Sequence, residues 1–344
     1  MNDSTLQSAH SPRRRGLTID EYETGVREGR MAVLARALTL VESRNPQHQL
    51  QAEELLNRLL PQTGGAIRVG ITGAPGAGKS TFIEALGLHL VAAGRRVAVL
   101  AVDPSSGVSG GSILGDKTRM AGLSSAEGAF IRPSPSAGTL GGVARKTRES
   151  MLICEAAGYD VVLIETVGVG QSETMVADMT DCFLALMLPG AGDELQGIKR
   201  GLLELVDIIA VNKADGATRA AAEVAAQQYV TALDSLPSRK GHDSPVVLTC
   251  SALHRLRIDE VWRTVASRHE KMLASGELTK RRQRQNLRWV WSVVEDRLRQ
   301  ALRSHPGVQA IRDEIEQDVL SGKLLPEAAA RRILAAFDAA GGGS

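Results

Sequence analysis

The sequence predicts an α/β fold in which a mostly parallel central sheet is covered by helices. Short runs rich in Val, Ile, Leu and Ala alternate with stretches of helical periodicity between residues 67 and 253, and such alternation is typical of βαβ crossovers. Only 3% of the 344 residues are aromatic. The core must therefore be built from aliphatic side chains, as in sheets whose strands are buried on both faces.

Six apolar segments of strand length are expected to form this sheet. They cover residues 67–72, 96–102, 160–165, 182–188, 207–212 and 246–249. A helix is expected over residues 79–93, because the helical spacing there ends at Gly94, a residue that favours helix termination.

Helical extensions are expected on both sides of this α/β region. Residues around Met31, Leu34, Leu38 and Val41 show helical spacing before the chain reaches the first strand. A charged helical arm follows the last strand, is interrupted at Pro306, and is of the kind that often mediates oligomerisation. The expected organisation is a disordered tail at 1–17, a helical extension at 18–62, the core domain at 63–275, the arm at 276–340 and a flexible tail at 341–344.

Composition excludes several classes of function. The net charge of +2 argues against bulk binding to nucleic acid or to a membrane by the whole chain. No apolar run is long enough to span a bilayer, and residues 1–15 lack the apolar region of a secretory signal. Three cysteines without a C-x-x-C pair indicate a reducing compartment, so a cytoplasmic location is expected.

A phosphate-binding motif follows the first expected strand. Residues 73–80 match G-x-x-x-x-G-K-[ST], in which glycines let backbone N–H groups turn inward around a phosphate at a helix N-terminus. We expect Lys79 to bridge the β- and γ-phosphates, Ser80 to ligate Mg²⁺, and Thr81 to contact the α-phosphate. The predicted nucleotide contacts here are Gly73, Ala74, Pro75, Gly76, Ala77, Gly78, Lys79, Ser80 and Thr81.

Two of the expected strands lead into carboxylates, Asp103 and Glu165. Ligands of open α/β sheets lie at the carboxyl ends of strands, so both acids should face the phosphate loop and hold Mg²⁺ or orient the attacking water. Either acid alone could instead cap a loop. Gly168 is expected to donate its N–H to the γ-phosphate. The loop after it is a natural switch, in which Gln171 either positions water or faces solvent.

A base-recognition motif follows the fifth expected strand. The run N-K-x-D places Asn212, Lys213 and Asp215 at the strand end. The Asp215 carboxylate can accept hydrogen bonds from N1–H and the exocyclic amine of guanine together, and adenine offers no such pair of donors. Lys213 is expected to pack along the base and Asn212 to join the loops. Backbone N–H groups of the Ser251-Ala252-Leu253 segment should meet guanine O6. These motifs together predict GTP and GDP as ligands.

Longer runs resemble one family, the MeaB/MMAA (ArgK-type) metallochaperone GTPases. The runs that carry the resemblance are "AVDPSS" (101–106), "GGSILGDKTRM" (110–120), "IRPSPSAGTLGGVARKTRE" (131–149), "ETVGVGQSE" (165–173) and "LPGAGDELQGIKRG" (188–201). The resemblance covers residues 30–291. It implies a homodimeric GTPase that gates adenosylcobalamin loading of an acyl-CoA mutase, above all methylmalonyl-CoA mutase, and touches that cofactor only through the mutase.

The resemblance also implies roles for individual residues. By position, Asp103, Asp116 and Glu165 correspond to the shell of Mg²⁺ and its waters, and Asp193 and Lys199 to a switch that responds to the partner. We take Lys199 as the candidate for a catalytic cation. Residues 107–109 read Gly-Val-Ser, where the family usually carries a Thr and Arg-like stretch. This departure is compatible with a related partner, such as an isobutyryl-CoA or 2-hydroxyisobutyryl-CoA mutase.

Three alternatives of other classes remain at this point. A nucleotide-dependent protein kinase linked to transport would place phosphate on a protein acceptor. A maturation GTPase for nickel would need a His- or Cys-rich metal store, which the sequence does not contain. A binding scaffold without turnover is disfavoured by the joint presence of Lys79, Ser80, Asp103 and Glu165.

Overall fold

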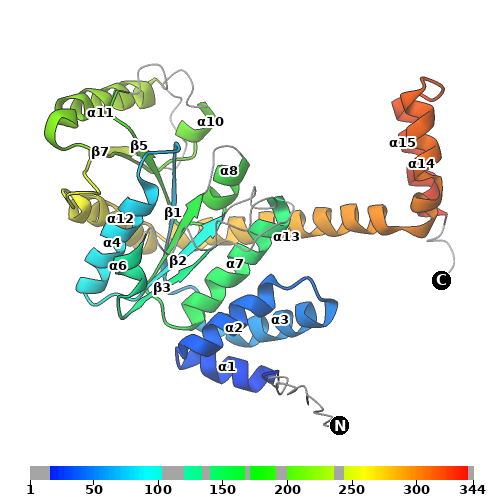
Figure 1. The fold of residues 1–344 in the computed structure, drawn as a ribbon, viewed down its shortest axis with the longest axis horizontal. Coiled ribbons are helices and arrows are strands. Elements are labelled where there is room, and N and C mark those ends of the chain that lie inside the picture. Colours follow the sequence, from blue (N-terminus) through cyan, green and yellow to red (C-terminus); the bar gives the residue numbers. More distant parts are fainter. Residues whose placement is uncertain are drawn as a thin grey trace, which may run out of the picture. The chain divides into compact units, whose positions relative to one another are not determined.

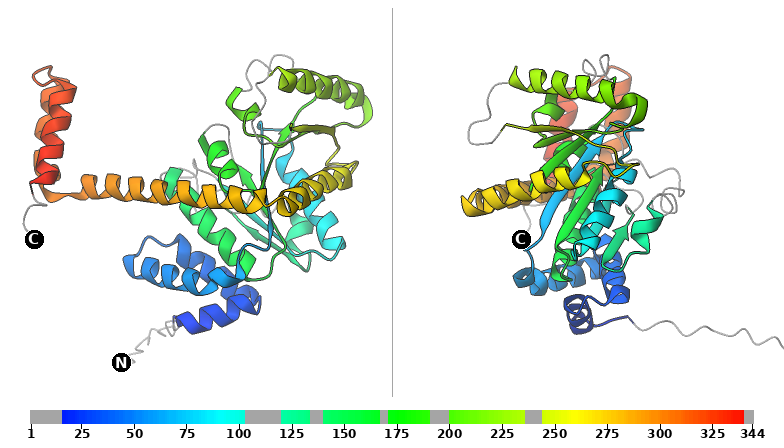
Figure 2. Two further views of the ribbon diagram at one scale, coloured as in Figure 1. Left: turned by 180° about the vertical axis from the view of Figure 1, so that it is seen from behind. Right: turned by 90° about the vertical axis from the view of Figure 1, so that its left-hand side faces the viewer.

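The computed structural model describes residues 16–102, 120–133, 140–166, 171–190, 200–235 and 244–339. It divides into two compact units, Met1–Lys271 and Met272–Ser344. The first unit holds the sheet, and the second is helical (Figures 1 and 2). None of the helices within the described ranges is long and apolar enough to cross a membrane.

A parallel sheet forms the centre of the first unit. The seven strands lie in the order β3-β2-β4-β1-β5-β6-β7, and every ladder between them is parallel. The strands are β1 (Ile67–Gly73), β2 (Val97–Val102), β3 (Ala129–Arg132), β4 (Val161–Thr166), β5 (Cys182–Met187), β6 (Ile208–Val211) and β7 (Val246–Thr249). The predicted α/β class is confirmed. β3 was not among the expected strands.

Alternation along the strands divides the core between the two faces of the sheet. Val69 and Ile71 of β1 pack in one cluster with Phe82 and Leu86 of α4 (Lys79–Ala92). The other face carries α7 (Leu140–Ala156) and α8 (Gln171–Ala177), as Figure 1 shows. At Gly70, on that face, an added Cβ would lie 2.7 Å from Val176 of α8. The sheet thus has helices on both faces. The remaining elements of this unit are α6 (Ala121–Ser124), α10 (Arg200–Leu203), η2 (Gly216–Thr218), α11 (Arg219–Asp234) and α12 (Ile258–Ala274).

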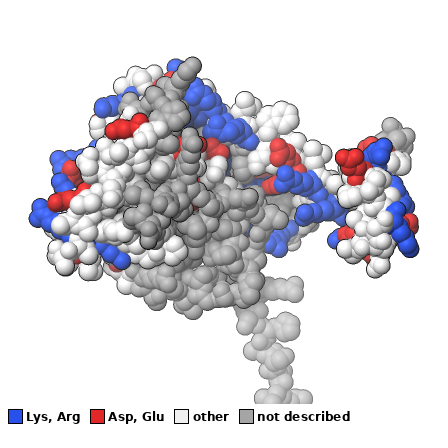
Figure 3. Space-filling view, turned by 90° about the horizontal axis from the view of Figure 1, so that it is seen from above, with Lys and Arg blue, Asp and Glu red and all other residues white. Residues whose placement is uncertain are grey.

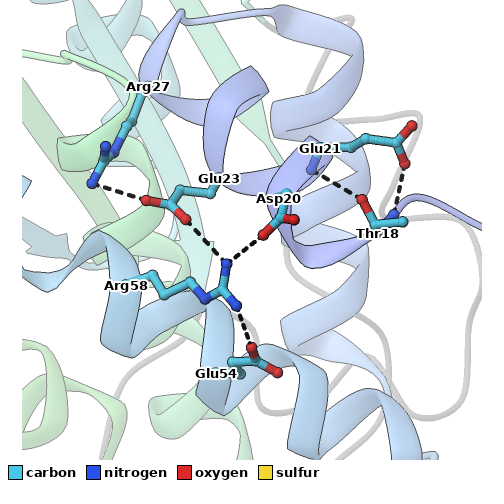
Figure 4. Close-up of polar contacts among 7 residues, drawn as sticks. All are labelled: Thr18, Asp20, Glu21, Glu23, Arg27, Glu54 and Arg58. Atoms are coloured by element: carbon cyan, nitrogen blue, oxygen red, sulfur yellow. Dashed lines mark hydrogen bonds and ion pairs between the residues drawn. The ribbon is translucent and has the colours of Figure 1, made fainter.

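Between residue 16 and the sheet, three helices pack on α7. They are α1 (Ile19–Arg27), α2 (Met31–Glu42) and α3 (Pro46–Leu59), followed by the single turn η1 (Leu60–Gln62). Thr18 and Glu21 form a reciprocal capping box that starts α1. Arg58 of α3 reaches Asp20, Glu23 and Glu54, so one guanidinium joins α1 to α3 (Figure 4).

Beyond the end of α12, the described part of the second unit contains three helices. They are α13 (Glu277–Ser304), α14 (Pro306–Leu320) and α15 (Pro326–Asp338). Pro306 ends the pattern of α13 as expected, but it also starts α14, a helix that the sequence analysis did not predict. Proline suits this first helical position because its missing N–H would have no partner there.

A buried ion pair joins the start of the sheet to α7. The guanidinium of Arg68 on β1 donates to both oxygens of Glu155, over 2.6 and 2.9 Å, and the same carboxylate accepts from the N–H of Gly64 at 2.7 Å. Arg68 and Glu155 are 6% and 5% exposed. Removing one partner of such a pair leaves an uncompensated charge in the core.

We predict that Glu155→Ala lowers the free energy of unfolding by about 3–5 kcal/mol, because the Arg68 guanidinium then stays buried without its partner. Urea unfolding followed by circular dichroism measures the change. The matched control is Glu223→Ala, which breaks an exposed pair with Arg219 and should change that free energy by about 0.5 kcal/mol or less. Equal effects of the two substitutions would contradict the prediction.

Candidate functional site

The phosphate loop lies between β1 and α4, where the motif places it. Gly76 and Gly78 have φ values of +80° and +86°, in the left-handed region that favours glycine. Gly73 lies so close to β5 that an added Cβ would be 2.2 Å from the carbonyl oxygen of Leu186. Backbone conformation and the close packing of a neighbouring strand therefore require glycine at these positions of the motif.

Lys79, the first residue of α4, folds back over the loop. Its Nζ donates to the carbonyl oxygen of Gly73 at 2.7 Å and lies 3.4 Å from that of Ala74. Burial lowers the pKa of the Lys79 ammonium from its ordinary value, and the nearby carboxylates of Glu165 and Glu173 act in the opposite direction. A half-buried ammonium at the mouth of the loop is suited to phosphate oxygens.

Ser80 and Glu165 come together beside the loop. The Ser80 hydroxyl donates to Oε1 of Glu165 over 3.2 Å, although 85 residues separate them in sequence. The parallel pairing of β1 with β4 places the two groups at the same sheet edge. A hydroxyl and a carboxylate are hard oxygen donors, so this pair fits Mg²⁺.

A buried chain of hydroxyls lies directly behind these groups. The Thr166 hydroxyl donates to that of Thr72 at 2.9 Å, and Thr72 donates to the Glu173 carboxylate at 3.0 Å. Sequence reasoning did not select these three residues as functional. The available signal was the placement of polar side chains at the ends of two otherwise apolar strands.

Asn212 joins the phosphate loop to the base-recognition segments. Its Nδ2 donates to the carbonyl oxygen of Ala77 at 2.8 Å, and its Oδ1 accepts from the N–H of Ala252 at 2.9 Å. Gly78 approaches the same amide so closely that an added Cβ would lie 2.8 Å from Nδ2. With 2% exposure, Asn212 lies between the loops it joins.

Asp215 is held in place by the segment that follows β7. Its Oδ2 accepts from the hydroxyl of Ser251, and its Oδ1 lies 3.8 Å from Nε2 of His254. Lys213 is exposed and has a φ of +59°, a conformation that side chains other than glycine rarely adopt. Asp215 and Lys213 lie in one loop at the carboxyl end of β6. No local spacing predicts the proximity of His254.

The backbone amides expected at guanine O6 differ in availability. The N–H of Ser251 donates to the carbonyl oxygen of Leu256 at 3.0 Å, and the N–H of Ala252 donates to Asn212. Among the described residues, no acceptor is found for the N–H of Leu253, whose side chain is exposed. The geometry therefore favours the Leu253 amide for this contact.

Several expected site residues lie outside the described part of the chain. They are Asp103, Asp116, Gly168, Asp193 and Lys199, together with the side chain of Gln171. Thr81 is described and exposed in the first turn of α4. The expected roles of all these residues remain predictions.

We predict that Asp215→Asn weakens GDP binding by about a hundredfold or more, because one acceptor for the guanine donors becomes a donor. Xanthosine diphosphate carries a carbonyl where guanine carries its amine, so its affinity should rise. Fluorescence titration with both nucleotides measures the change. Asp234→Asn, an exposed change at the end of α11, is the matched control. An unchanged preference for GDP in the Asp215 variant would contradict the prediction.

Comparison with known proteins agrees with this arrangement. Residues 34–307 match the family described as methylmalonyl-CoA mutase-associated GTPase MeaB. The GTPase ArgK of Escherichia coli is 52% identical over 81% of this chain and 84% of its own length. The mitochondrial methylmalonic aciduria type A homolog of Mus musculus is 46% identical over 93% of this chain and 79% of its own.

A solved structure extends the agreement to the fold. The crystal structure of an LAO/AO transport system kinase is 40% identical in sequence, covers 96% of this chain and 98% of its own, and has a TM-score of 0.74. On the match over residues 34–307 and on these identities, the chain is a P-loop GTPase that belongs to the MeaB family of methylmalonyl-CoA mutase-associated GTPases.

Proposed function

We propose that this GTPase is a metallochaperone that gates the loading of adenosylcobalamin into an acyl-CoA mutase and protects that mutase. The observation that carries the proposal is the joining of a phosphate loop to a guanine-selective segment through Asn212, in a chain whose family is described as mutase-associated. Methylmalonyl-CoA mutase is the first candidate partner. GTP and GDP states then differ in what they present to the partner.

The described residues divide the work of GTP hydrolysis among them. The phosphate loop and Lys79 bind the β- and γ-phosphates, and Asp215 selects guanine. Ser80 and Glu165 would hold Mg²⁺, which supplies charge neutralisation at the phosphates when bound. We propose Asp103 and Asp116 as further residues of this metal and water shell, and Gly168 as a γ-phosphate contact.

The partner response is proposed to act through residues 171–199. Gln171 is the candidate for positioning water, and Asp193 and Lys199 for sensing the mutase. A cation brought to the phosphates can raise turnover by about 10³–10⁵-fold in other GTPases. Lys199 is our candidate for that cation.

A protein is the proposed partner, with no direct contact to nucleic acid, membrane or cobalamin. Lys and Arg side chains are interspersed with Asp and Glu over the described surface seen in Figure 3. Such a mixed surface favours specific contacts over the field of one sign that nucleic acid requires. The three cysteines are buried thiols outside any disulfide, which supports a cytoplasmic location.

We predict that the purified protein hydrolyses GTP and not ATP, and that adding apo methylmalonyl-CoA mutase accelerates release of free phosphate. A phosphate-release assay with each nucleotide measures both. Phosphate found on a protein acceptor would instead favour the kinase alternative. Stimulation by an isobutyryl-CoA or 2-hydroxyisobutyryl-CoA mutase alone would transfer the function to that partner. ATP turnover would overturn the role of Asp215.

The variant Lys199→Ala tests the partner response in the same assay. The ratio of stimulated to unstimulated turnover should fall towards one, because the cation that the partner brings into place is missing. Lys323→Ala, at an exposed position between α14 and α15, is the matched control. Equal stimulation of the Lys199 variant and the unaltered protein would rule out this role.

Homodimerisation is proposed to use the exposed face of α13. Apolar side chains recur on this helix every three or four residues, the spacing of a helix–helix seam. The exposed members are Leu287, Val290, Trp291, Val294 and Leu298. An exposed apolar stripe of this length is typical of an interaction surface.

We predict that Leu298→Glu shifts the protein from dimer to monomer, because the new charge would be buried in the seam. Sedimentation equilibrium gives the mass. Gln300→Glu adds the same charge at an exposed position two residues away, on a different side of α13, and should leave the dimer intact. A monomeric unaltered protein would overturn the proposal.

A further inference from the structure

Glu173 is a buried carboxylate that the proposed chemistry leaves unused. It lies in the first turn of α8 and is 6% exposed. Within the described ranges, the hydroxyl of Thr72 is its hydrogen-bond donor, at 3.0 Å, and no lysine or arginine nitrogen lies within 4 Å. Burying a carboxylate without an ion pair is costly, so its position calls for a physical reason.

The hydrogen bonds around Glu173 have a fixed direction. An ionised carboxylate only accepts, so the single hydroxyl proton of Thr72 must point to Glu173. The Thr72 oxygen then accepts from Thr166 at 2.9 Å. Thr72 and Thr166 are both 0% exposed, so no water competes for these groups. One carboxylate thus orients two hydroxyls on neighbouring strands.

Two members of this Thr166–Thr72–Glu173 hydrogen-bond chain are sequence neighbours of residues in the phosphate site. Thr72 precedes Gly73, whose carbonyl accepts from Lys79, and Thr166 follows Glu165, which accepts from Ser80. The two strand ends are already fixed by the pairing of β1 with β4. The hydrogen-bond chain therefore adds α8 to the two strand ends that are already paired.

The packing of α8 shows how closely it is held. At Gly70, an added Cβ would come within 2.7 Å of Val176, so the helix rests directly on β1. Thr166 and Glu173 flank residues 167–170 in sequence, and both are tied to the same Thr72 oxygen.

We propose that Glu173 is a positioning residue for GTP hydrolysis, which holds the first turn of α8 against the strand ends that carry Gly73 and Glu165. Glu173 acts through Thr72 and Thr166 and needs no contact with the nucleotide. Loss of Glu173 should lower the rate of GTP hydrolysis, because the attack on phosphate depends on this arrangement. It should change the affinity for GDP much less. This inference rests on the proposed GTP turnover.

The test compares Glu173→Gln, which removes the charge, with Thr72→Val, which removes the hydroxyl at nearly constant volume. We expect each to lower kcat for GTP by about tenfold to a hundredfold, the range of one hydrogen bond to a charged group, while Kd for GDP changes by less than about threefold. Thr72→Ser restores the hydroxyl and should turn over about tenfold faster than Thr72→Val. In the double variant the two losses should not add, because Glu173→Gln weakens and Thr72→Val removes the same hydrogen bond.

Thr147→Val is the matched control, since among the described residues its buried hydroxyl bonds only to the carbonyl oxygen of Val143 in its own helix. This variant should keep the turnover of the unaltered protein. Unchanged kcat in both Glu173→Gln and Thr72→Val would overturn the inference alone. Equal losses in Thr72→Val and Thr72→Ser would also overturn it, because packing would then explain them. Absence of GTP turnover in the unaltered protein would overturn the proposed function together with this inference.

Discussion

The side-chain amide of Asn212 connects the two halves of the nucleotide site. It donates to the phosphate loop at Ala77 and accepts from the segment after β7 at Ala252. Because an amide carries a donor and an acceptor at fixed separation, one residue sets the spacing between the phosphate loop and the segment proposed to recognise guanine. The absence of a Cβ at Gly78 leaves room for this contact, since an added Cβ would lie 2.8 Å from Nδ2.

Parallel strands explain why the other site groups meet. All six ladders run in the same direction, so the ends of β1, β4 and β6 lie at one edge of the sheet. Ser80 reaches Glu165 across this edge, and Thr72 reaches Thr166. Helices on both faces exclude water from the strands, which makes these few polar contacts strong and directional.

Buried ion pairs also join distant segments away from the nucleotide site. Arg68 pairs with Glu155 where β1 begins, and Asp207 accepts from Arg268 at 2.8 Å beside β6. Each pair fixes a helix to the amino end of a strand, opposite to the carboxyl ends that carry the site. The N-terminal helices then pack on α7, whose Glu155 makes one of these pairs. Polar contacts between distant segments thus stabilise the sheet at both the amino and the carboxyl ends of its strands.

The sequence by itself determined the α/β class and the phosphate loop, and it predicted a guanine-selective run. These are local patterns whose chemistry depends on neighbouring residues. It also placed Glu165 at a strand end. Only the tertiary structure decided that β3 forms the sheet edge, that Asn212 bridges two loops, and that Thr72, Thr166 and Glu173 form one chain. Thr72 lies 94 residues from Thr166 and 101 residues from Glu173 in the sequence. Such contacts depend on strand order and register, which no local spacing encodes.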